Sequence, residues 1–223
     1  MDQFTVILRT NWTINLISPL IPVLAMVIHR HLKRFEALPW MGRLEVLFFF
    51  GLLVNWALLG MAVFRVRNLW LLDLMILPEG LFSLWVMDAI TPLRLPRLFR
   101  LGAIGIMATV SAWDGIRLGL EVKWVLAQII TSLLILAASL WRLKEYLIQD
   151  TSGSPYDRSV FWFLAAMTLE HATLLISYPM NDIFLRQLSR DWVLVPWLAR
   201  FSTGLALNLA FARTFLCPKP SSS

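Results

Sequence analysis

The sequence contains seven apolar runs, and each is long enough to cross a bilayer as an α-helix. A helix rises about 1.5 Å per residue, so roughly 20 apolar residues span the hydrocarbon core. We therefore expect an all-α, polytopic integral membrane protein, a seven-transmembrane-helix bundle in which residues 1–223 form a single membrane domain. The predicted helices cover residues 11–29, 45–64, 70–92, 101–117, 123–141, 160–178 and 192–212.

The composition agrees with a membrane protein and argues against several other classes. Hydrophobic residues make up 58% of the chain and charged residues 15%, whereas soluble domains contain about 25% charged residues. The net charge of +6 is spread over short loops, which is typical of contact with the headgroups of a lipid bilayer rather than with nucleic acid. The single cysteine, Cys217, excludes an intramolecular disulfide and a cysteine-based metal cluster. We expect neither a metal nor a cofactor.

The loop charges predict an orientation, because cytoplasmic loops of membrane proteins carry an excess of lysine and arginine. With the N-terminus outside and the C-terminus inside, the inner segments hold twelve of these residues, the outer segments hold seven, and Arg200 lies within a run. We therefore predict this orientation, in a bacterial inner (plasma) membrane. Tryptophans near the ends of the runs, such as Trp40 and Trp124, are typical of an interfacial aromatic belt. Asp73 and Asp114 also lie near run ends, and we expect both to reach water or headgroups.

The third run contains the triplet Pro78-Glu79-Gly80 near its middle. Proline removes a backbone hydrogen bond and glycine loosens a helix, so the triplet predicts a weak point in this helix. A carboxylate at such a depth costs about 2.5–3.5 kcal/mol on insertion scales. We therefore expect groups on other helices to gather around Glu79 and compensate its charge.

Polar side chains of other runs lie at a similar depth. Each is found close to the midpoint of its run or, for Asn208, on the same helical face as Arg200. Two acids and one base at this level form a group that could titrate, which is typical of a proton or cation site. A purely structural ion pair among Glu79, Glu170 and Arg200 remains an alternative. The predicted ligand- or proton-binding residues are Asn55, Glu79, Glu170, His171, Arg200 and Asn208.

The functional interpretation depends on this polar level, because no catalytic residue or known motif stands out. The last run has no lysine for a retinal Schiff base, and the chain has no H-x-x-x-H, P-loop or G-x-S-x-G pattern. We expect a sensory or receptor-like protein that binds a small ligand or a proton, with a cytoplasmic partner protein at its inner loops. The alternative is a proton-coupled transporter of a small solute. A lipid-modifying enzyme comes third, because no nucleophile can be identified.

Overall fold

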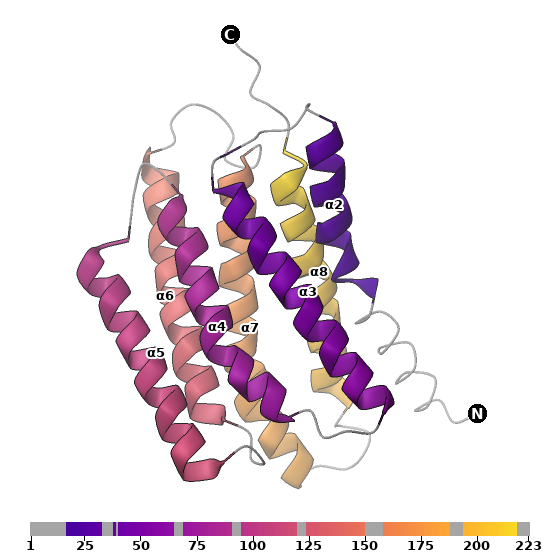
Figure 1. Cartoon of the computed structure of the whole chain (residues 1–223), viewed down its shortest axis with the longest axis vertical. Helices are drawn as coiled ribbons and strands as arrows, with labels where there is room; N and C mark the ends of the chain where they lie inside the picture. Colours follow the sequence, from indigo (N-terminus) through magenta and orange to yellow (C-terminus); the bar gives the residue numbers. More distant parts are fainter. Residues whose placement is uncertain are drawn as a thin grey trace.

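The described part of the chain is entirely helical. The computed structural model describes residues 17–32, 38, 40–64, 69–90, 95–119, 124–149, 158–187 and 194–217, and the side chains of residues 178–201 lie outside this description. The helices of the described residues, shown in Figure 1, are α2 (Leu20–His31), α3 (Met41–Val63), α4 (Leu69–Ala89), α5 (Arg97–Leu118), α6 (Val125–Gln149), α7 (Ser159–Gln187) and α8 (Leu194–Phe215).

Each predicted run overlaps one of these helices, and the longest apolar helices identify a membrane-embedded protein. Among the described residues, α3, α4, α6 and α7 are long and apolar enough to span a bilayer, and α2 is a shorter apolar helix. The helix α5 differs, since its 22 residues include Arg97, Arg100, Asp114 and Arg117, which lower its hydropathy. The all-helical character is thus confirmed for the described residues, and four of their helices have the length and hydropathy to span a membrane.

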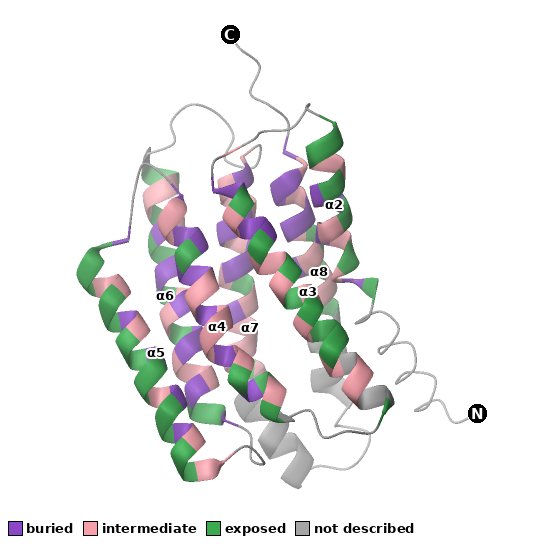
Figure 2. Cartoon of the chain, viewed as in Figure 1, coloured by how far each residue is buried: buried purple, intermediate pink, exposed green. Residues whose placement is uncertain are grey.

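Six helices follow one another in a closed ring. In this ring α2 contacts α3, α3 contacts α4, α4 contacts α6, α6 contacts α7, α7 contacts α8, and α8 returns to α2. The remaining helix, α5, lies at the edge of the bundle against α4 and α6 (Figure 1). Figure 2 shows that the outward faces of α5 and of the second half of α3 are largely exposed, as lipid-facing surfaces are expected to be. The α5 helix begins after Pro96 and ends just before Gly119, whose positive φ of 69° suits glycine.

One end of the bundle, which we call the Trp40 end, is closely packed. Trp40 is buried and its ring lies 5.4 Å from the ring of Phe163 on α7. Phe163 lies 6.3 Å from Phe211 on α8, which in turn lies 5.0 Å from Phe48 on α3. Phe215 at the end of α8 is fully buried and completes the cluster, 5.8 Å from Phe48. These edge-on and tilted rings join α3, α7 and α8 through dense van der Waals contact, which holds helices together inside lipid.

Several charged side chains at the Trp40 end have defined partners. Arg142 is almost fully buried and donates a hydrogen bond to the carbonyl of Ile90, directly after the last residue of α4. A cation at this position complements the negative end of the α4 helix dipole. The described ion pairs of this end join Arg30 to Glu45, Arg100 to Asp88, and Arg142 to Glu145.

At the opposite end, two aspartates hold the first turn of α6. Asp73 Oδ1 on α4 accepts a hydrogen bond from the backbone N–H of Trp124 (3.2 Å), and Asp114 Oδ2 on α5 accepts one from Ala127 (2.8 Å). Both aspartates are 3% exposed and Trp124 is 6% exposed. The prediction that these three side chains reach water or headgroups was wrong, because both carboxylates satisfy N–H groups that a helix start leaves unpaired. Trp124 instead packs on Gly115, where a Cβ would lie 3.0 Å from its ring.

Candidate functional site

A cavity of about 350 Å³ lies inside the bundle, between α3 on one side and α2, α4, α7 and α8 on the other. Its volume falls within the range of about 300–1,000 Å³ that is usual for small-molecule sites. The aromatic cluster of the Trp40 end bounds the cavity through Phe48 and Phe211, and Met167 of α7 also lines it. Gly51 and Asn55, on the α3 side of the lining, are exposed, and the mouth of the cavity therefore lies along α3.

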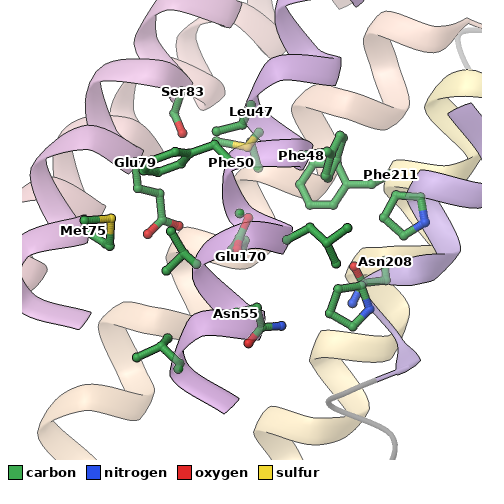
Figure 3. A pocket seen from close by; sticks show the side chains of 17 residues that line it. Leu47, Phe48, Phe50, Asn55, Met75, Glu79, Ser83, Glu170, Asn208 and Phe211 are labelled. Atoms are coloured by element: carbon green, nitrogen blue, oxygen red, sulfur yellow. The ribbon is translucent and has the colours of Figure 1, made fainter. Parts of the chain in front are cut away.

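Four of the six predicted site residues line this cavity, and each comes from a different helix. Asn55 belongs to α3, Glu79 to α4, Glu170 to α7 and Asn208 to α8. Figure 3 shows their side chains around the same space, with the carboxylate of Glu79 directed into it. Both carboxylates have interaction partners within the chain, so a ligand would join or replace an existing contact. Their ligand- or proton-binding role stays a prediction.

The helix α4 places Glu79 by packing its neighbour closely against other helices. Gly80 is buried, and a Cβ added there would lie 2.8 Å from both Met107 Sδ on α5 and Thr131 Cγ2 on α6. Successive residues of a helix are about 100° apart, so anchoring Gly80 against α5 and α6 directs Glu79 toward the cavity. The helix is continuous through Pro78, from Leu69 to Ala89. Gly80 therefore allows close packing. The weak point predicted at this triplet does not interrupt the helix.

The two asparagines add polar groups to the lining, and one of them, Asn208, makes a defined hydrogen bond. Asn208 Nδ2 donates to the carbonyl of Gly204 one turn earlier in α8, at 2.9 Å. Its Oδ1, which only accepts hydrogen bonds, and the second hydrogen of Nδ2 are the groups that Asn208 retains for other partners. Asn55 is exposed on α3 and lies where the cavity opens. The buried hydroxyl of Ser83, one turn from Glu79 on α4, is the remaining polar group of the described lining.

Apolar side chains make up the rest of the walls. Phe48 and Phe211 form an edge-to-face pair with ring centroids 5.0 Å apart. Phe50 lines the α4 side, and its ring lies 5.0 Å from that of Phe82. Two prolines from the start of α2 complete the surface. The sequence prediction missed Met75, Ser83 and Phe211, although a spacing of four from Glu79 and three from Asn208 places them on the faces already selected.

The other two predicted residues are not brought to the cavity by the described structure. His171 follows Glu170 on α7, but its side chain is 3% exposed, is absent from the cavity lining, and has no hydrogen-bond partner at Nδ1. Because neighbouring helical residues point about 100° apart, Glu170 and His171 face different surroundings. Arg200 lies in α8, but its side chain falls outside the described residues. Within the described part of the chain, no group of three or more His, Cys, Asp or Glu side chains could hold a metal ion.

Comparison of the chain with models of protein families, with curated proteins and with solved structures finds no match. The function must therefore be argued from the cavity itself.

Proposed function

We propose that the protein is a seven-helix membrane sensor, with its N-terminus outside and its C-terminus inside a bacterial inner membrane, that binds a small ligand or a proton in the central cavity. The observation that carries the proposal is the meeting of Asn55, Glu79, Glu170 and Asn208 at one ligand-sized space. Ionisable residues within membrane helices are costly and commonly mark ligand or ion sites. A space bounded by five helices also links its occupancy to their relative positions.

The helix that would respond most readily is α3. Only 17% of its apolar stretch is buried, against 33% to 39% in α4, α6 and α7. A ligand that contacts α3 together with α4, α7 or α8 would favour one position of α3 over others. Because Glu45 on α3 pairs with Arg30 on α2, such a shift would be felt at the Trp40 end. A cytoplasmic partner protein that contacts the loops of this end could read it.

The proposed orientation is supported by the basic side chains that gather at the Trp40 end, among them Arg30, Arg100 and Arg142. A membrane-impermeant maleimide tests it, in a Cys217→Ser background. Glu121→Cys, between α5 and α6, is expected to react in intact cells. Ser152→Cys, between α6 and α7, is expected to react only after the membrane is permeabilised. The reverse pattern would place the Trp40 end outside.

Thermal unfolding of the purified protein in lipid nanodiscs tests the site. We expect the melting temperature of the wild type to change with pH or with a bound small molecule, and Glu79→Gln or Glu170→Gln to reduce that change. The matched control is Glu145→Gln, which removes a carboxylate paired with Arg142 outside the cavity. If both cavity variants respond as the wild type does, the cavity is not the site.

A proton-coupled transporter is the second candidate, favoured by the presence of two carboxylates in one cavity. Carboxylates inside a membrane bundle can bind and release the coupling proton. Proteoliposomes separate the two candidates: a transporter takes up solute when a pH gradient is imposed, and the uptake is lost in Glu79→Gln. Ligand binding without uptake under any gradient would exclude the transporter and support the sensor.

A further inference from the structure

The chemistry of the cavity lining restricts what it can bind, and charge is the first restriction. Glu79 and Glu170 are the only ionisable side chains in the described lining, and both are acids. The described part of the lining therefore carries two acids and no base. Negative charge at this depth repels an anion, because the low-dielectric surroundings screen the repulsion poorly. The cavity therefore disfavours carboxylate, phosphate and sulfonate ligands.

The hydrogen-bonding groups give the second restriction. Ionised carboxylates only accept hydrogen bonds, and Asn208 adds the acceptor Oδ1 beside an Nδ2 that already donates one of its two hydrogens to Gly204. The lining is thus rich in acceptors on three helices, α4, α7 and α8. A ligand that joins or replaces the existing contacts of the two glutamates can do so by supplying donors. An ammonium group supplies three, together with the positive charge that the first restriction requires.

The walls give the third restriction. The Phe48–Phe211 pair, Phe50, Leu52 and Met75 present carbon and sulfur to most of the cavity. A small inorganic cation would leave these walls in contact with water, and the described residues hold no cluster of metal ligands. An apolar body fills such walls, and aromatic faces also attract a cation that lies close to them.

We infer that the cavity binds an amphipathic organic monocation, a primary amine whose ammonium group lies between Glu79 and Glu170 and whose apolar body packs against Phe48 and Phe211. This inference rests on the proposed function and adds the chemical class of the ligand. The ammonium group would accept no hydrogen bond and would donate to the carboxylates and to Asn208 Oδ1. The phenylalanine pair would enclose the carbon skeleton.

Three probes that share one carbon skeleton test the class: phenylbutylamine, phenylbutanol and phenylbutyrate. Binding is measured by calorimetric titration of the purified protein in nanodiscs, with empty nanodiscs as the partitioning control. We expect the amine to bind at least about tenfold more tightly than the alcohol, as one charge-assisted hydrogen bond is sufficient for that ratio. The carboxylate is expected to bind most weakly. Equal binding of all three, tighter binding of the alcohol or the carboxylate, or no binding of the amine would overturn the inference.

Variants locate the binding. Glu79→Gln and Glu170→Gln are each expected to weaken the binding of the amine about tenfold and to leave the binding of the alcohol unchanged. Glu145→Gln is expected to change neither affinity. Amine binding that is unaffected by both cavity variants would overturn the assignment. If the alcohol or the carboxylate binds tightly and this binding is lost in Glu79→Gln, the cavity remains a ligand site. Only the assignment of the ligand to the cations is then overturned. The failure of the inference is thus distinguishable from the failure of the proposed function.

A measurement on the wild type covers the case in which a variant does not fold. Dicyclohexylcarbodiimide modifies carboxyl groups inside membranes, and mass spectrometry of the digested protein reads the modified positions. We expect phenylbutylamine to suppress the N-acylurea adduct at Glu79 and Glu170, either by blocking the reagent or by forming an amide with the activated carboxyl and releasing dicyclohexylurea, and phenylbutanol to leave the adduct unchanged. Equal modification with and without the amine would overturn the inference.

Discussion

The Trp40 end and the central cavity share three helices, α3, α7 and α8, yet they are packed in opposite ways. At the Trp40 end, α3, α7 and α8 contribute Leu44, Phe163 and Phe215, each 0% exposed. Further along the same helices, Asn55, Glu170 and Asn208 surround about 350 Å³ of space. The dense end can therefore fix the relative positions of the three helices while the middle of the bundle stays open. Stability and binding are thus assigned to different stretches of the same helices, and a trade-off between them is common in proteins.

The largest expected effect comes from truncating the dense end. Phe163→Ala should lower the free energy of unfolding by about 3 kcal/mol, because the cavity it leaves lies among closely packed rings. Met75→Ala, at the wall of the existing cavity, should cost about 1 kcal/mol or less, since space already adjoins that side chain. Unfolding in mixed detergent micelles measures both. If Met75→Ala were as destabilising as Phe163→Ala, the middle of the bundle would be packed and the contrast would disappear.

The next effect concerns two glycines that differ in their surroundings. Gly80→Ala should destabilise the protein by about 2 kcal/mol, because the new Cβ overpacks Met107 and the stiff Thr131. Gly51→Ala introduces the same methyl group with nothing within 4 Å of it. It should be neutral or stabilising by up to about 1 kcal/mol, the usual gain of alanine over glycine in a helix. Equal effects at both positions would mean that α4 is not held against α5 and α6 at Gly80.

A smaller effect is expected where α6 begins. Asp114→Ala should cost about 1–2 kcal/mol, because it leaves the N–H of Ala127 without its acceptor in a buried setting. Thr109→Ala, on the exposed face of α5, which also carries Asp114, is the control and should change stability by less than about 0.5 kcal/mol. The measurement is again unfolding in mixed micelles. A neutral Asp114→Ala would contradict the capping role.

The smallest effect on stability is expected inside the cavity. Glu79→Gln keeps the shape of the side chain and removes a charge that is costly at this depth, so unfolding should change by less than about 1 kcal/mol. The same variant should lose most of the pH- or ligand-dependent shift in melting temperature. A large loss of stability together with an unchanged shift would show that Glu79 belongs to a structural ion pair and not to a site.

The sequence allowed the helices and the depth of the polar groups to be predicted, because run length and distance from the run midpoint need no knowledge of neighbours. Glu79, Glu170 and Asn55 were selected in this way, and the structure places all three at one cavity. Run lengths say less about which face of a helix points into the bundle. Glu170 lines the cavity while His171, one residue later, is buried elsewhere.

Contacts between distant segments were out of reach of the sequence. The acceptor for Trp124 is Asp73, 51 residues earlier, and no local pattern marks an aspartate that caps another helix. Gly80 was interpreted as loosening α4, whereas the atoms that require a glycine belong to α5 and α6. The position of α5 at the edge of the ring likewise depends on which helices contact it.

The central claim is that side chains of α4 and α7 face one shared space inside the bundle, and paired cysteines test it most directly. In a Cys217→Ser background, Glu79→Cys is combined with Glu170→Cys or with Ile176→Cys, which is 63% exposed on the outward side of α7. A short flexible bismaleimide is added to the protein in membranes, and the link is read by mass spectrometry. We predict a link between positions 79 and 170 and none between 79 and 176. A link at 176 with none at 170 would contradict the account.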